Sequence, residues 1–147
     1  PEGSIDAAYS NSLIEHLHPD DVRDQVENIY TALAANGHYV CVTPNATLGP
    51  HDVSKHFDDV ATGFHLKEYT ISELKALLES VGFSDIRVLV GLKHRFFNLP
   101  AWPVIGFERL VGTLPRRWRQ ALLSFKPTKR LLRGLLGAKV VGQKSRQ

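Results

Sequence analysis

The sequence predicts an α/β fold with a mostly parallel sheet, and three observations support this prediction. Residues 5–10 and 38–43 are apolar segments of strand length, and residues 20–35 between them have the apolar period of a helix. A strand–helix–strand crossover is right-handed, so its two strands lie parallel in one sheet. A second helix and an alternating strand at 70–81 and 83–90 continue the alternation typical of α/β domains.

The first crossover has clear boundary signals. Residues 5–10 are short and apolar enough to form a buried strand, and Pro19 suits a helix start because its backbone is preset for the first turn. Asp20 and Asp21 follow where the helix dipole favours acidic side chains. We expect Gly37 to end this helix. One helical face carries the apolar residues Val22, Val26, Ile29, Tyr30 and Leu33.

The next elements are separated by a long loop. Residues 38–43 are β-branched and aromatic, and Pro44 ends that strand. Residues 44–69 form a loop of a length that is usually functional or disordered, and its aromatic content favours an ordered one. A capping box from Thr70 to Glu73 begins the second helix, and Gly82 ends it.

The composition indicates a protein of a reducing compartment. Cys41 is the only cysteine and falls within a predicted strand, which argues against a disulfide framework. We see no signal peptide and no segment apolar enough to span a membrane, so we predict a cytoplasmic location. The sequence has no methionine and begins almost on a strand, so we expect it to be part of a longer chain.

Charge divides the sequence sharply into two parts. Residues 1–92 contain 5 Lys and Arg against 14 Asp and Glu, whereas residues 93–147 contain 13 Lys and Arg and a single acid, Glu108. This asymmetry predicts a basic surface that faces something anionic. The alternative is that the basic part only neutralises an acidic body.

The basic part has its own organisation. Prolines divide it into helices near 104–112, 115–125 and 128–136, and a short terminal strand follows at 139–143. The favoured interpretation is a helical insertion, apolar inside and basic outside. Peripheral membrane contact through 100–133 comes second, because basic amphipathic helices with Trp and Phe bind anionic surfaces. Nucleic-acid contact comes last.

Several segments resemble the second half of a class I S-adenosylmethionine-dependent methyltransferase. Residues 10–17, which include the turn Glu15-His16-Leu17, are similar to the turn after that family's fourth strand. Residues 33–37 and 43–45 resemble the turns around its fifth strand. The resemblance continues through 64–74 and 81–83 into its sixth strand, and more weakly at 138–145, its seventh.

The resemblance implies a Rossmann-like half-sheet, with crossover helices and family strand order 4-5-7-6, and a basic helical insertion before a last antiparallel strand. On this basis residues 1–92 form the C-terminal half of the core, 93–137 the insertion or cap, and 138–147 the last strand and tail. The family's glycine-rich cofactor loop is absent from this sequence. We therefore expect a missing N-terminal half of the same chain, and little activity without it.

The implied function is transfer of a methyl group from S-adenosylmethionine to a small-molecule or lipid-linked acceptor, at an oxygen atom. The alternative is a non-catalytic α/β binding module whose basic surface meets a membrane or another anionic partner. The residues that the resemblance places beside the cofactor are Ser10, Asn11, Ser12 and Leu13.

Further site residues follow from the rule that ligands bind outside the carboxyl ends of parallel strands. His16 and His65 are candidate general bases because imidazole titrates close to neutral pH, and Glu15 is their candidate partner. Metal binding and a purely structural role for the Glu15-His16 pair are the alternatives. Metal-dependent relatives carry a further Glu where Ser12 stands, so we predict no metal. The candidate substrate contacts are Asn45, His65 and Tyr69.

Overall fold

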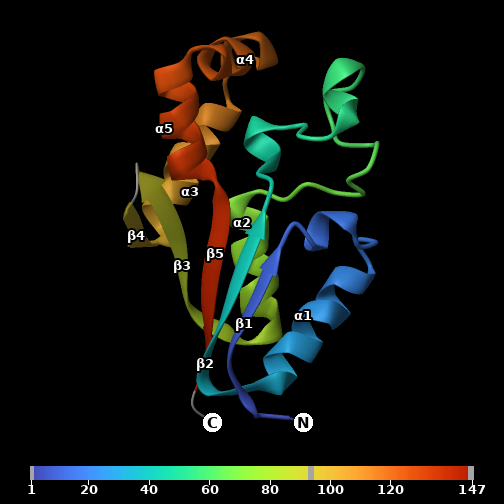
Figure 1. Cartoon of the computed structure of the whole chain (residues 1–147), viewed down its shortest axis with the longest axis vertical. Helices are drawn as coiled ribbons and strands as arrows, with labels where there is room; N and C mark the ends of the chain where they lie inside the picture. Colours follow the sequence, from blue (N-terminus) through green and yellow to red (C-terminus); the bar gives the residue numbers. More distant parts are fainter. Residues whose placement is uncertain (1, 93–94, 146–147) are drawn as a thin grey trace.

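The computed structural model describes residues 2–92 and 95–145, which form a five-stranded sheet with helices (Figure 1). The strands are β1 (Ile5–Asn11), β2 (Leu33–Thr43), β3 (Phe83–Leu92), β4 (Arg95–Pro100) and β5 (Ala138–Lys144). The helices are α1 (Asp21–Ala32), α2 (Ile71–Val81), α3 (Ala101–Gly112), α4 (Arg116–Ser124) and α5 (Lys126–Leu136).

The sheet order is β1-β2-β5-β3-β4. β1 and β2 are parallel, as predicted for a crossover through α1, and β5 is antiparallel to both of its neighbours. The α/β fold class is therefore confirmed. The four expected strands lie in the order β1-β2-β5-β3.

β4 adds a strand that was not predicted, in the segment 93–137 that was expected to be a helical insertion or cap. β4 instead pairs antiparallel with β3 at the outer edge of the sheet. Its sequence contains Phe96 and Phe97, which favour strands, and it ends at Pro100, which an edge strand tolerates. The first helix of this region then begins at Ala101, three residues before the predicted start.

Gly37 does not end α1, contrary to the prediction. The helix stops at Ala32, and Leu33 is already extended, with its side chain fully buried in the core. The register of β1 and β2 shifts beyond the pair formed by Ile5 and Leu33, so β2 is irregular between Leu33 and His38. Gly37 suits this irregular part because an added Cβ would lie 2.8 Å from the Ala34 carbonyl oxygen.

α2 matches its prediction closely. Thr70 accepts from the Glu73 amide, while the Glu73 carboxylate accepts from the Thr70 amide, which completes the capping box. Gly82 ends the helix at φ 115°, a conformation that favours glycine. Ile86, Val88 and Val90 are buried along β3, as their alternation predicted.

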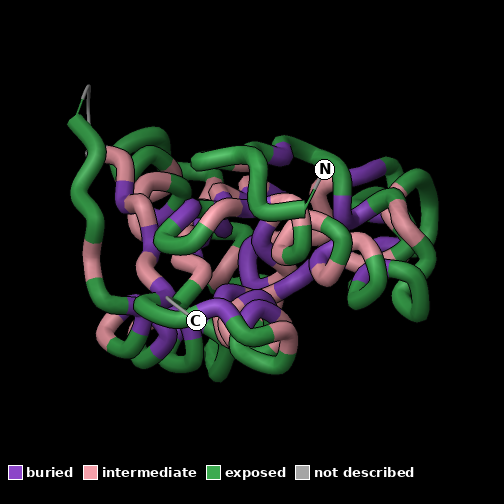
Figure 2. Tube along the Cα trace, turned by 90° about the horizontal axis from the view of Figure 1, so that it is seen from below, coloured by how far each residue is buried: buried purple, intermediate pink, exposed green. Residues whose placement is uncertain are grey.

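The helices α1 and α2 lie against one face of the sheet, where the hydrophobic core forms. Tyr39, Cys41, Val88 and Val140 are buried on that face, and buried segments run through the middle of the molecule in Figure 2. β1 was predicted to be buried, but most of its residues are exposed. It lies at the sheet edge, and its Tyr9 is 67% exposed on the face opposite these helices.

The basic helices lie toward the β3 and β4 edge of the sheet, whereas α1 lies at the β1 edge (Figure 1). α5 contacts β3, α4 contacts α5, and α3 contacts α2 (Figure 1). In the part of the chain that the structure describes, no helix has the length and apolar character needed to cross a membrane.

Candidate functional site at the carboxyl ends of β1 and β2

The candidate site lies where β1 and β2 end, at the edge of the sheet beneath the long loop (Figure 1). A 3-10 turn, Ile14–His16, follows β1 there, and residues 44–69 follow β2. Because the two strands are parallel, both carboxyl ends open on the same side, which is where α/β sheets bind ligands.

Glu15 is the buried centre of this site. Its side chain is 0% exposed, and its Oε2 accepts a 2.8 Å hydrogen bond from Thr43 Oγ1 at the end of β2. Its Oε1 is buried and has no hydrogen-bond partner among the described residues. The Glu15 carbonyl accepts a bond from the Leu66 amide, so the turn also holds the long loop in place.

His16 and His65 meet beside Glu15, with ring centroids 5.0 Å apart and an edge-to-face angle of 73°. His16 Nδ1 lies 3.0 Å from the Phe64 carbonyl oxygen, and His65 Nδ1 lies 2.8 Å from Glu68 Oε1. Both partners are acceptors, so both imidazoles donate from Nδ1. The Nε2 atom of each ring is then the one that can accept a proton.

Glu68 positions the histidine that lies deeper in the site. Its carboxylate accepts from His65 and also from the His51 ring and amide, at 3.0 Å and 2.7 Å. Burial alone would raise the pKa of Glu68, but the hydrogen bonds from His51 and His65 together lower it. Sequence reasoning missed this residue, and the only available signal was its three-residue spacing from His65.

Asp52 orders the loop around the two histidines. Its carboxylate accepts from the amides of Ser54, Gly63 and His65 at 2.9, 3.0 and 3.2 Å. Burial would raise the pKa of Asp52, but these N–H donors lower it to about 2. The loop of residues 44–69 is therefore held by a carboxylate in its interior, which supports the expectation of an ordered loop.

The predicted cofactor residues divide into two groups. Ser10 points into the core, where its Oγ lies 2.7 Å from the Tyr39 hydroxyl, and burial raises the pKa of that hydroxyl. Asn11 and Ser12 are exposed at the end of β1, and Leu13 is exposed beside them. Ser12 adopts φ 52°, so the chain turns sharply there.

The predicted substrate residues also differ in accessibility. Asn45 is buried, and its Nδ2 donates to Glu108 Oε1 and the Leu136 carbonyl while its Oδ1 accepts from the Thr47 amide. Tyr69 is buried next to it. These contacts give Asn45 a structural role, whereas His65 reaches the candidate site. The prediction that Asn45 and Tyr69 touch the substrate stays a prediction, because their burial and hydrogen bonds do not support it.

Glu15, His16 and His65 could also hold a cation. Each offers a ligand atom, and these atoms lie within 4.8 Å of one another. Two imidazoles and a carboxylate form a donor set that transition metals use. The same three side chains could instead accept and pass a proton. The geometry fits both uses, so the predicted absence of a metal stays a prediction.

The chain belongs to the methyltransferase domain family, whose model matches residues 1–88. This stretch contains β1, β2, α2 and most of β3, together with the candidate site. A comparison with curated proteins found no match.

Several solved structures of similar fold are methyltransferases. A SAM-dependent methyltransferase from Archaeoglobus fulgidus is 18% identical, with a TM-score of 0.53, and the match covers 98% of this chain and 61% of that one. A second structure is phosphoethanolamine N-methyltransferase 2 from Haemonchus contortus, in complex with phosphomonomethylethanolamine and S-adenosylhomocysteine. It is 16% identical, with a TM-score of 0.52, and the match covers 99% of this chain and 35% of that one.

A third structure, 1,6-didemethyltoxoflavin-N1-methyltransferase from Burkholderia thailandensis with bound 1,6-didemethyltoxoflavin and S-adenosylhomocysteine, is 16% identical. Its TM-score is 0.50, and the match covers 99% of this chain and 46% of that one. The chain thus spans between about a third and three fifths of the length of these proteins. It has the fold of part of a SAM-dependent methyltransferase.

Proposed function

We propose that this chain is the acceptor-side half of an S-adenosylmethionine-dependent methyltransferase that acts on a small-molecule or lipid-linked acceptor. The observation that supports this most is that exposed Asn11 and Ser12 end β1 just before the turn that carries His16, whose ring contacts His65, within the stretch that matches the methyltransferase family. A polar strand end is thus followed directly by a turn that carries a candidate proton acceptor.

The residues after β1 fit one wall of a cofactor site. Asn11, Ser12 and Leu13 are accessible there, while Ser10 supports them from the core. When bound, S-adenosylmethionine supplies an activated methyl group, so the protein chiefly has to orient the acceptor and exclude water. The sequence has no G-x-G run to cradle the rest of the cofactor. We propose that an upstream segment of the same protein provides that part.

The sheet itself supports an upstream partner segment. Within the described residues β1 pairs with β2 alone, so its outer edge has unpaired backbone groups. Tyr9, Val40 and Val42 lie on the sheet face away from α1, and all three are at least partly exposed. A strand beside β1 would pair with its open edge, and a helix over the face away from α1 would cover these three side chains.

His65 is the best candidate for the proton acceptor. Glu68 fixes its Nδ1–H, and the lowered pKa of Glu68 keeps that carboxylate ionised at neutral pH. Its Nε2 can then accept the proton that an acceptor hydroxyl loses during methylation, which is the reason we propose transfer to oxygen. His16 is close enough to share or replace this role.

The experiment compares His65→Gln with His56→Gln in the protein extended upstream. His56 is an exposed histidine of the same loop, so its replacement controls for loss of an imidazole. We expect His65→Gln to lower the rate of methyl transfer about 100-fold, with S-adenosylhomocysteine binding unchanged, and His56→Gln to have no effect. Equal rates in all three proteins would remove His65 from the mechanism.

A binding module without catalysis is the second candidate, because the chain carries only one wall of a cofactor site. This alternative predicts that the extended protein does not bind S-adenosylhomocysteine either. Calorimetric titration of the extended protein with that product separates the two functions.

A further inference from the structure

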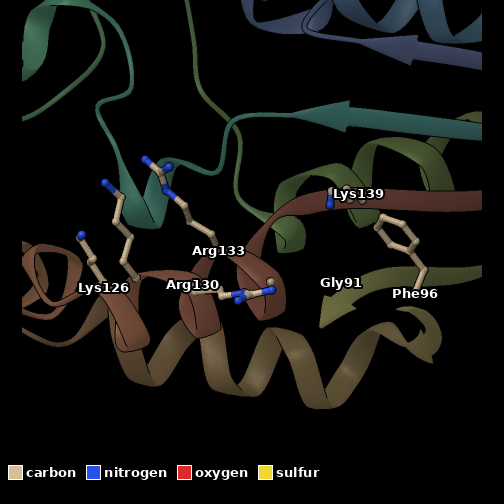
Figure 3. A pocket seen from close by; sticks show the side chains of 8 residues that line it. Gly91, Phe96, Lys126, Arg130, Arg133 and Lys139 are labelled. Atoms are coloured by element: carbon tan, nitrogen blue, oxygen red, sulfur yellow. The ribbon is translucent and has the colours of Figure 1, made fainter. Parts of the chain in front are cut away.

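A strongly basic pocket lies between α5 and the end of the sheet, outside the candidate site. It has a volume of about 450 Å³. Its walls come from β3, β4, α5 and β5 (Figure 3). The residues that line it are Gly91, Phe96, Lys126, Lys129, Arg130, Arg133, Gly134 and Lys139.

Four of its cations come from one side of α5. Lys129 and Arg130 come three and four positions after Lys126, and Arg133 comes one turn further on, so the four residues share a helical face. Leu132 and Leu136 lie to one side of these cations on α5, and both are buried in the core. Because the core fixes the rotation of α5, the cations are presented together. In Figure 3 the Arg130 side chain extends from α5 toward the end of β3.

The sheet supplies the fifth cation and an apolar wall. Lys139 Nζ lies 5.0 Å from the centroid of the Phe96 ring, within the range of a cation–π contact. Gly91 leaves space between them. A Cβ at position 91 would lie 3.1 Å from Phe96 Cε1 and 3.6 Å from Lys139 Nζ. A larger side chain at this position would therefore narrow the pocket.

No acid balances these charges. None of the lining residues is acidic, and none of the five cations forms an ion pair with a carboxylate of the residues described here. Glu108, the single acid of residues 93–147, is buried against Asn45 and the start of α2 instead. Five like charges around one hollow repel each other and attract an anion.

We propose that this basic pocket binds a phosphate group, carried either by a soluble phosphoester or by an anionic lipid headgroup. Arg130 and Arg133 can each hold two oxygens of a phosphate, and the lysines add further donors. Phe96 offers an apolar surface to the carbon next to the phosphate. The pocket opens at the sheet end where β2 finishes, since Thr43 pairs with Ala138 beside Lys139.

This binding does not depend on methyl transfer, and it can be measured without S-adenosylmethionine. The full chain is titrated with inorganic phosphate and glycerol 3-phosphate by calorimetry, and it is sedimented with phosphatidylcholine vesicles with and without phosphatidic acid. The pocket variant is Arg130→Gln with Arg133→Gln. The matched control is Arg109→Gln with Arg117→Gln, because these exposed arginines lie outside the pocket and remove the same charge.

We expect the pocket variant to weaken binding at least about tenfold and the control to weaken it less than about twofold. Affinity for glycerol 3-phosphate would identify a soluble phosphoester as the ligand. Affinity for the phosphatidic acid vesicles alone would identify a lipid headgroup. Equal losses in the two variants would show unspecific charge attraction and overturn the proposal, as would a lack of binding to any of the probes.

A variant that keeps every charge tests whether the shape of the pocket matters for binding. Gly91→Val keeps every cation and adds bulk between Phe96 and Lys139. We expect it to weaken phosphate binding while the thermal midpoint of unfolding stays close to that of the parent, since valine favours strands. A correctly folded Gly91→Val protein with full affinity would contradict binding inside the pocket.

Discussion

Single buried carboxylates hold the parts of this molecule together. Glu108 comes from α3 in the basic segment, yet it accepts hydrogen bonds from Asn45 after β2 and from the Ile71 and Ser72 amides at the start of α2. An anion at a helix N-terminus satisfies free amides and interacts favourably with the helix dipole. This residue fastens the basic segment to the core.

Replacing Glu108 should therefore destabilise the whole fold. Glu108→Ala removes the acceptor of the Ile71 and Ser72 amides and one of the two acceptors of Asn45 Nδ2, and we expect the free energy of unfolding to fall by about 2–3 kcal/mol. Glu79→Ala is the control, because the Glu79 side chain forms an exposed ion pair with Lys75, and its loss should cost less than about 0.5 kcal/mol. Urea denaturation measures both. Similar small losses would show that Glu108 does not connect the two parts.

Asp52 is the corresponding residue of the long loop, and its titration can be followed directly. The pKa of about 2 lies below the ordinary value of about 3.9. The stabilisation from Asp52 is therefore complete above pH 3.9 and disappears as the pH falls through 2. The NMR shifts of the Gly63 and His65 amides should follow this protonation with a midpoint near pH 2. A midpoint near 3.9 would contradict the hydrogen bonding described here.

At the scale of elements, the sequence predicted those whose signals are local. The capping box and Gly82 define α2, and their effects act within a few residues. The exposure of β1 and the pairing of β4 depend on what lies beside them in the sheet, which no local pattern records. The candidate site divides in the same way. His16 and His65 were predicted from their residue type and position in the sequence, whereas the role of Glu68 depends on how the loop folds around His65.

Two glycines of helical regions should respond to alanine in opposite ways. Gly82 has φ 115°, and a Cβ there would lie 3.2 Å from the Tyr30 hydroxyl oxygen, so Gly82→Ala should cost about 1 kcal/mol or more. Gly106 lies inside α3 with nothing within 4 Å of an added Cβ. Gly106→Ala should stabilise by up to about 1 kcal/mol. Thermal unfolding measures both, and shifts of the same sign would contradict this assignment.

At the scale of the molecule, the chain combines an acidic part, which matches the methyltransferase domain family over residues 1–88, with a basic segment. Helices cover one face of the sheet, while the opposite face and the β1 edge stay accessible. The candidate site opens at the carboxyl ends of β1 and β2, and the basic pocket opens at the same end of the sheet.

The most direct measurement is calorimetric titration of S-adenosylhomocysteine into two proteins. One is the chain of 147 residues, and the other is the same chain extended upstream by native coding sequence of about half a domain. The account predicts that only the extended protein binds, because this chain provides one wall of the cofactor site. Failure of both folded proteins to bind would contradict the methyltransferase function, and equal binding by both would contradict the division of the site.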